Sequence, residues 1–195
     1  MVILLLHMEI KLLDKYSALI KGKKESVLIN PNGDLLEKDK NSRIVVFTEN
    51  SVNISNFLGE KIIVAGAGEY EIGGVEIWGS DVDGNNTIYD IKIDGVSIMI
   101  LGQLQDVLSD KKIERIEGID VLVAPVVIGD KVSFKIIKDW AKKWGVNYLI
   151  PVGDEENLKK FLDDADEEGL EAVDSLKVEK ENLPDGLELK LLKIV

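Results

Sequence analysis

Residues 66–78 read Gly-Ala-Gly-Glu-Tyr-Glu-Ile-Gly-Gly-Val-Glu-Ile-Trp, and this stretch carries the strongest structural signal in the chain. Its two halves, residues 69–72 and 75–78, place an apolar residue at every second position and flank Gly73-Gly74. Such alternation is typical of β-strands with one buried face. Paired glycines supply the positive φ angles that a two-residue turn needs. The stretch therefore predicts a tight β-hairpin.

Strands dominate the rest of the first half. Asp94-Gly95 is a favoured turn pair and predicts a second hairpin. Residues 44–47 and 62–65 are continuously apolar, as in strands that are buried on both faces. Residues 31–34 read Pro-Asn-Gly-Asp and predict a turn. The remaining predicted elements are strands at 8–12, 17–21, 26–30, 87–93 and 96–101, and a loop at 79–86.

Helices alternate with strands in the second half. Ser133 can cap a helix that ends at Gly145, and its apolar positions share one face, so Trp140 and Trp144 are predicted to lie in the core. Asp154 can cap a second helix. The other elements are a short helix at 109–116, strands at 121–124 and 148–150, a stop for the second helix at Gly169, and two strands around Pro184 within 176–195. This order predicts a layered α/β protein with mixed sheets.

Composition excludes several classes of function. The 195 residues carry a net charge of −12, which disfavours nucleic-acid binding. The chain has no cysteine and a single histidine, His7, so neither a thiolate site nor a Ser–His–Asp triad is expected. The apolar run at residues 2–6 is too short for a signal-peptide core or a membrane span. We expect a soluble, cytoplasmic protein without membrane contact.

Five segments in one order resemble the metallo-β-lactamase-fold hydrolases. The similarity is greatest to a short branch that includes ascorbate-6-phosphate lactonase-like proteins. The segments are residues 8–20, 27–31, 66–72, 86–95 and 120–126. This resemblance implies an αββα sandwich, in which two mixed sheets pack back to back with helices outside. It also implies a single domain over residues 1–195, with residues 1–7 as an upstream extension.

The resemblance also places a site, but its metal ligands are missing from this sequence. Active members carry a Thr-His-x-His-x-Asp-His loop, and the matching stretch is 48–54. Glu49, Ser51 and Ile54 stand where histidines are expected, and Asn53 stands where aspartate is expected. The other vestigial positions are Asp14 in place of an early glycine, Gln103 in place of a bridging aspartate, Gly153 in place of the last histidine, and the adjacent Asp154.

These replacements remove the chemistry that the family implies. Zinc in such sites takes imidazole nitrogen and carboxylate oxygen and lowers the pKa of its bound water to about 7. This chain lacks the nitrogen donors. We therefore predict no catalytic residue, no bound metal and no cofactor.

The acidic residues allow two other interpretations. Asp14, Glu49, Asp81 and Asp154 could form an oxygen-only site for Mg²⁺, Mn²⁺ or Ca²⁺. Their interpretation as solvated loop acids in an acidic protein is preferred. Glu69 invites a catalytic reading, but we expect the stretch around it to be structural.

The preferred function is non-catalytic. The chain would be a pseudoenzyme that acts as a binding or assembly module, for a small ligand in the old cleft or for a protein partner. The alternative is a hydrolase with a carboxylate-bound metal or a metal-free mechanism, and a homo-oligomeric subunit is a third reading. Converging acids would favour the hydrolase, whereas a cleft plugged by Ile54 would favour the module.

Overall fold

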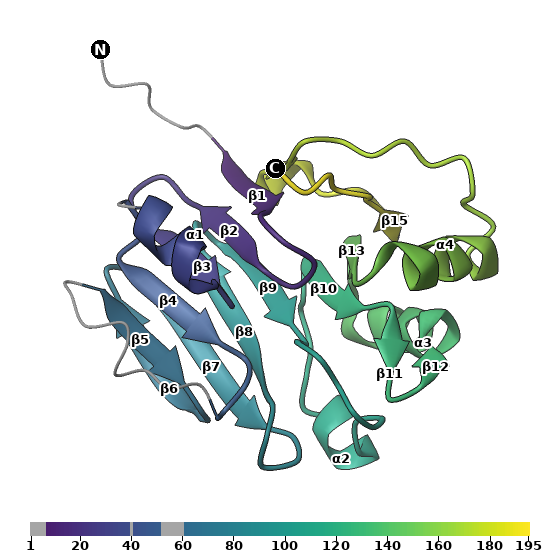
Figure 1. The fold of residues 1–195 in the computed structure, drawn as a ribbon, viewed down its shortest axis with the longest axis horizontal. Helices are drawn as coiled ribbons and strands as arrows, with labels where there is room; N and C mark the ends of the chain where they lie inside the picture. The colour runs from purple at the N-terminus through teal and green to yellow at the C-terminus, as the bar shows by residue number, and fades with distance from the viewer. Residues whose placement is uncertain (1–6, 40, 52–60) are drawn as a thin grey trace.

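The fold is built from two mixed β-sheets that pack face to face (Figure 1). We analysed a computed structural model, which describes residues 7–39, 41–51 and 61–195. Within these residues the chain forms a six-stranded sheet, a seven-stranded sheet and a two-stranded ribbon. The ribbon pairs β11 (Val127–Ile128) with β12 (Lys131–Val132).

The first sheet is antiparallel on one side and parallel on the other. Its strand order is β14 (Leu176–Val178), β1 (Met8–Leu12), β2 (Ala18–Lys21), β3 (Ser26–Ile29), β4 (Ile44–Phe47) and β5 (Ile62–Ala65). The pairs from β14 to β3 are antiparallel, and β3, β4 and β5 run parallel. The strands predicted in this half are therefore confirmed.

The second sheet contains both predicted hairpins. Its order is β15 (Glu188–Leu189), β13 (Tyr148–Val152), β10 (Val121–Pro125), β9 (Val96–Ile100), β8 (Thr87–Ile93), β7 (Val75–Asp81) and β6 (Gly68–Ile72). Gly73 and Gly74 adopt positive φ angles in the first turn, as do Asp94 and Gly95 in the second. β7 runs on to Asp81, so the predicted loop at 79–86 begins three residues later than expected.

The period-two alternation of strands decides which side chains meet between the sheets. In β9, Ile98 and Ile100 face the other sheet, whereas Met99 faces outward. β4 follows the same rule and is buried on both faces, as predicted. The prediction that β5 is also buried on both faces is wrong. β5 is the edge strand, and Ile62 is 39% exposed.

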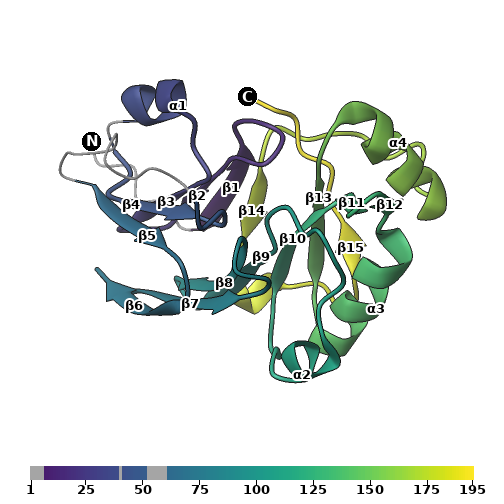
Figure 2. The same ribbon diagram turned by 60° about the horizontal axis from the view of Figure 1, so that its bottom comes forward.

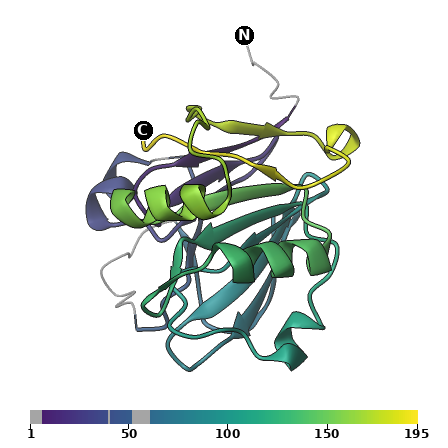
Figure 3. The same cartoon turned by 90° about the vertical axis from the view of Figure 1, so that its right-hand side faces the viewer.

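Helices cover the outer faces of both sheets (Figure 2). α1 (Gly33–Lys38) packs on the first sheet through Leu36. The second sheet is covered by α2 (Asp110–Ile113), α3 (Phe134–Trp144) and α4 (Glu155–Asp164). Figure 3 shows the two longer helices on this face, where the rings of Phe134 and Phe161 meet edge to face at 5.2 Å. The αββα arrangement is thus confirmed.

The helix predictions succeeded where a long apolar face was present. Trp140 and Trp144 are buried and stack at 5.6 Å, and α3 ends at Gly145 in the left-handed conformation. α4 ends at Asp164, before the expected Gly169, and α2 is shorter than predicted. The turn predicted at 31–34 instead starts α1, because the Asn32 side chain accepts a hydrogen bond from the Leu35 N–H and caps the helix. Turn residues and capping residues share this chemistry.

The C-terminal segment links the two sheets. β14 joins the first sheet and β15 joins the second, with the 3₁₀ helix η2 (Lys180–Asn182) between them. The two strands predicted here are present, but they do not pair with each other. In the described ranges, no helix is long and apolar enough to cross a membrane.

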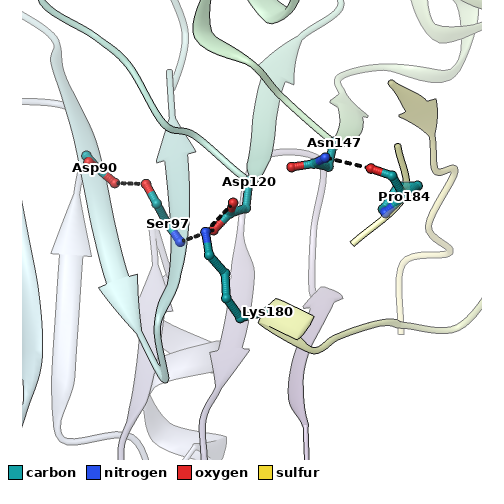
Figure 4. Close-up of polar contacts among 6 residues, drawn as sticks. All are labelled: Asp90, Ser97, Asp120, Asn147, Lys180 and Pro184. Atoms are coloured by element: carbon teal, nitrogen blue, oxygen red, sulfur yellow. Dashed lines mark hydrogen bonds and ion pairs between the residues drawn. The ribbon is translucent and has the colours of Figure 1, made fainter. Parts of the chain in front are cut away.

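A buried carboxylate fixes this segment to the second sheet (Figure 4). Asp120 accepts the Ser97 N–H at 2.9 Å and binds the Lys180 ammonium at 2.6 and 2.7 Å. The Ser97 hydroxyl donates to Asp90 at 2.6 Å. Asn147 adds a second anchor by donating to the Pro184 carbonyl at 2.7 Å. β14 and β15 do not pair with each other, so this polar network is what fixes the segment between them to the second sheet.

Replacing Asp120 should cost far more stability than replacing an exposed partner of an ion pair. Asp120→Ala should lower the free energy of unfolding by roughly 2–3 kcal/mol, because it leaves the Ser97 N–H unpaired and releases Lys180. Asp174→Ala breaks an exposed pair with Lys193 and should change stability by less than about 0.5 kcal/mol. Urea unfolding followed by circular dichroism measures both values. Equal losses in the two variants would contradict a structural role for Asp120.

Candidate functional site

The vestigial positions that the sequence singled out follow the ends of four strands. Asp14 follows β1, Glu49 and Ser51 follow β4, Gln103 follows β9, and Gly153 and Asp154 follow β13. Asn53 and Ile54 lie outside the described residues, so the predicted plug at Ile54 is not tested.

Side chains and glycines from these loops form one connected cluster. Asn30, at the end of β3, accepts the Thr48 N–H at 2.8 Å through its Oδ1. Its Nδ2 donates to the Thr48 hydroxyl at 3.0 Å and to the Tyr16 carbonyl at 3.4 Å. Asn30 thereby joins the loops after β1 and β4. In the family that this sequence resembles, the strand usually ends in aspartate. The Asn30 amide differs from a carboxylate because it can donate hydrogen bonds as well as accept them. Its hydrogen bonds here connect the loops.

Two further asparagines connect the neighbouring loops. Asn86 donates to the Leu101 carbonyl at 3.0 Å. Asn50 donates to Asp81 at 3.0 Å and to the Gly84 carbonyl at 3.1 Å, and it accepts from the Thr87 hydroxyl at 2.7 Å. Sequence analysis missed these residues as site components. The sequence feature that could have identified them is their position next to the ends of core strands.

The four acids of the alternative oxygen-only site do not form a metal-binding group among the described residues. Glu49 accepts from the Ser51 hydroxyl at 2.5 Å, and Asp14 accepts from the Lys15 N–H at 2.8 Å. Asp154 caps α4, where hydrogen bonds from the backbone and side chain of Asn157 lower the pKa of its carboxyl. Each carboxylate has a local partner of its own. Among residues 7–39, 41–51 and 61–195, no three acidic or histidine side chains lie close enough together to hold a metal ion.

Two glycines show how tightly the cluster is packed. A Cβ on Gly153 would lie 2.3 Å from Val126 Cγ2, which is far inside van der Waals contact. A Cβ on Gly102 would lie 2.5 Å from the Thr48 hydroxyl oxygen and 2.7 Å from Asn86 Oδ1. Gly102 also has a φ of 65°, which favours glycine. A side chain at the position where the last histidine was expected would therefore require Val126 to move.

Tyr16 is the other side chain beside Gly153. Its hydroxyl oxygen lies 3.6 Å from the position of a Gly153 Cβ. Burial raises the pKa of the Tyr16 phenol, and the nearby Asp154 carboxylate adds to this effect. The phenol therefore stays neutral at physiological pH and can form hydrogen bonds, but it is a poor general base.

The Gly66–Tyr70 stretch is structural, as its turn chemistry predicted. Tyr70 packs against the core between the sheets. The fully buried Tyr89 donates to the Gly66 carbonyl at 3.0 Å, and burial raises the pKa of Tyr89 to about 12. This bond holds the turn before β6 onto β8. Glu69 is exposed and does not enter the cluster around Gly153.

Comparison with known protein families agrees with this geometry. The family described as the β-lactamase superfamily domain matches residues 9–153, which is most of the chain. This chain belongs to the β-lactamase superfamily. The match ends at Gly153, within the cluster described above. The lactonase-like branch stays a prediction, and the comparison with curated proteins gave no match.

Solved structures of the superfamily share the fold along nearly the whole chain. A Thermotoga maritima protein, named as a Zn-dependent hydrolase of the metallo-β-lactamase superfamily, is 21% identical with a TM-score of 0.76, and the alignment covers 95% of this chain and 99% of that one. The metallo-β-lactamase fold protein YhfI of Bacillus subtilis is 12% identical with a TM-score of 0.63, covering 96% and 97%. At these identities the likeness shows the fold alone.

The described residues at the superfamily's ligand positions do not fit zinc. Glu49 is the single carboxylate that stands directly at one of them, and it is engaged by Ser51. Gln103 offers a neutral amide, and Gly153 offers no side chain. Zinc sites in proteins need several imidazole, thiolate or carboxylate donors around one point. The described part of the site does not supply them.

The contact between Gly153 and Val126 can be tested by a double-mutant cycle. Gly153→Ala should lower the free energy of unfolding by roughly 1–3 kcal/mol, because the new methyl group overlaps Val126. In a Val126→Ala background the same change should cost about 1 kcal/mol less, because the space has been opened. Gly169→Ala is the control, since a Cβ there meets nothing within 4 Å. Additive losses in the cycle would mean that Val126 does not fill the site.

Proposed function

We propose that this chain is a catalytically degenerate member of the β-lactamase superfamily that acts as a binding or assembly module. The observation that carries the proposal is the contact of Val126 with Gly153, where a Cβ would lie 2.3 Å from Val126 Cγ2 and where the sequence offers no ligand side chain. The amides of Asn30, Asn50 and Asn86 support it, because their hydrogen bonds hold loops together. The neutral Tyr16 phenol at the cluster can form hydrogen bonds to a ligand.

The hydrolase alternative has less support. A carboxylate-bound metal would need Asp14, Glu49, Asp81 and Asp154 to converge, and each has a separate local partner. A metal-free mechanism would need a base such as His7, which precedes β1. The candidate site follows the other end of that strand, on the order of 17–20 Å away at about 3.3 Å per residue.

The setting of the module is part of the proposal. We propose that residues 1–195 form one domain working in the cytoplasm, where a chain without cysteine is unaffected by the reducing conditions. The net charge of −12 disfavours nucleic-acid partners. The binding partner that we propose is a protein, a second copy of the chain or a small ligand in the old cleft.

Elemental analysis of untagged protein tests the loss of the metal. We expect zinc, manganese and iron far below one equivalent per chain, and no change in thermal midpoint after treatment with a chelator. Glu49→Gln should leave both measurements unchanged. Near-stoichiometric metal in the native protein that Glu49→Gln removes would overturn the proposal.

Activity gives a second arm of the same test. Ester, lactone and phosphodiester substrates should not be hydrolysed above the rate in buffer, with or without added Zn²⁺ or Mn²⁺. Turnover that is lost in Glu49→Gln but retained in an exposed control such as Glu171→Gln would support the hydrolase instead.

A further inference from the structure

A cavity of about 270 Å³ lies away from the candidate site, on the outer face of the second sheet. Its floor comes from β7, β8 and β9, and its wall is the segment that follows α2. Pockets for drug-sized ligands usually span about 300–1,000 Å³, so this cavity lies just below that range and fits only a smaller molecule. The described residues that line it do not include any residue of the Gly153 cluster.

The floor places an indole, a carboxyl group and a thioether in one row. Trp78 on β7 pairs with Asp90 on β8, and Asp90 pairs with Met99 on β9. Trp78 is 36% exposed, although large aromatic side chains are usually more buried. Met99 is buried and gives the cavity an apolar base. An aromatic ring beside a carboxyl group is an arrangement that recognises ammonium groups.

The wall contributes charges of both signs and is held at two points. Arg115 and Glu117 line the cavity and are exposed. The segment before them is anchored by Lys112, which donates to the carbonyls of Asp81 and Val82, and by Trp144, which donates to the Ile113 carbonyl at 3.0 Å. In the part of the chain that the structure describes, neither Arg115 nor Glu117 forms an ion pair.

Asp90 is a cavity carboxyl group that is held by a hydrogen bond and is largely shielded from water. The Ser97 hydroxyl donates to its Oδ1, and Figure 4 shows Asp120 on the other side of Ser97. Burial is the main cause that raises the pKa of Asp90, the Asp120 and Glu76 carboxylates raise it further, and Ser97 and Lys92 oppose them. Ser97 and Lys92 therefore compensate an ionised Asp90 only in part, and a cationic group in the cavity would add to them.

We propose that this cavity binds a small zwitterionic amino acid. Its ammonium group would face Asp90 and Glu117, its carboxylate would bind Arg115, and its side chain would pack on Trp78 and Met99. A ligand that is only cationic would meet Arg115 unpaired, and one that is only anionic would meet two carboxylates. A zwitterion offers a partner to groups of both signs. This site lies outside the old metal cleft, so the inference does not depend on the loss of catalysis.

Isothermal titration calorimetry with matched ligands tests the charge pattern. The panel is L-alanine, L-leucine and L-phenylalanine, together with 2-phenylethylamine, which lacks the carboxylate, and 3-phenylpropanoate, which lacks the ammonium group. We expect at least one amino acid to bind, and L-phenylalanine to bind at least tenfold tighter than either analogue if it fits. Absence of binding by all three amino acids, or equal binding of an amino acid and its analogue, would overturn the inference.

Variants of the charged residues locate the site. Arg115→Gln and Glu117→Gln change exposed side chains, so they should fold normally and should each weaken amino-acid binding about tenfold, which corresponds to about 1.4 kcal/mol. Arg43→Gln is the matched control, because Arg43 is exposed, pairs with Glu25 and precedes β4 in the other sheet. Binding that survives both wall substitutions, or that Arg43→Gln weakens equally, would place the ligand elsewhere.

The pH dependence gives an independent readout for Asp90. Affinity should fall as the pH drops through the raised pKa of Asp90, because protonation removes the charge that faces the ammonium group. Asp90→Asn should weaken binding at neutral pH and flatten this dependence, while the amide still accepts from Ser97. A pH profile that is the same in the wild type and in Asp90→Asn would exclude Asp90 from the site.

Discussion

The apolar contact between the two sheets is the interaction on which the rest of this structure depends. Each sheet contributes the inward half of its alternating strands, such as Ile98 and Ile100 from β9 and Ile44 and Val46 from β4. Burial of these branched side chains fixes the register, because a one-residue slip would turn every inward side chain outward. The loops that form the candidate site start where these strands end. The inter-sheet core therefore positions the site as well as stabilising the fold.

The loops of the candidate site are held together by side-chain amides. Asn30, Asn50 and Asn86 join them by hydrogen bonds. Amides suit this task because each can donate and accept, so they close a network without burying a net charge. Val126 occupies the space above Gly153. Packing and hydrogen bonding thus hold the described part of the cleft, and the cavity beside Trp78 is separate from it.

The errors of the sequence analysis have a common physical origin. Residues 62–65 are as apolar as residues 44–47, yet only the latter have a strand on each side. The Asn32 side chain could close a turn or cap a helix, and the neighbouring Leu36, which packs on the first sheet, favoured the helix. Local patterns do not report which neighbour arrives from elsewhere in the chain.

The sequence by itself determined the two hairpins, the buried face of α3, a layered α/β class with mixed sheets and the absence of the superfamily's histidines, because alternation, turn chemistry and residue identity are local properties. Only the tertiary structure decided that β14 and β15 join different sheets, that Val126 closes the space at Gly153, and that Trp78, Asp90 and Arg115 line one cavity. Those facts depend on contacts between segments far apart in the chain. Such contacts follow from how the two sheets pack, which no local pattern encodes.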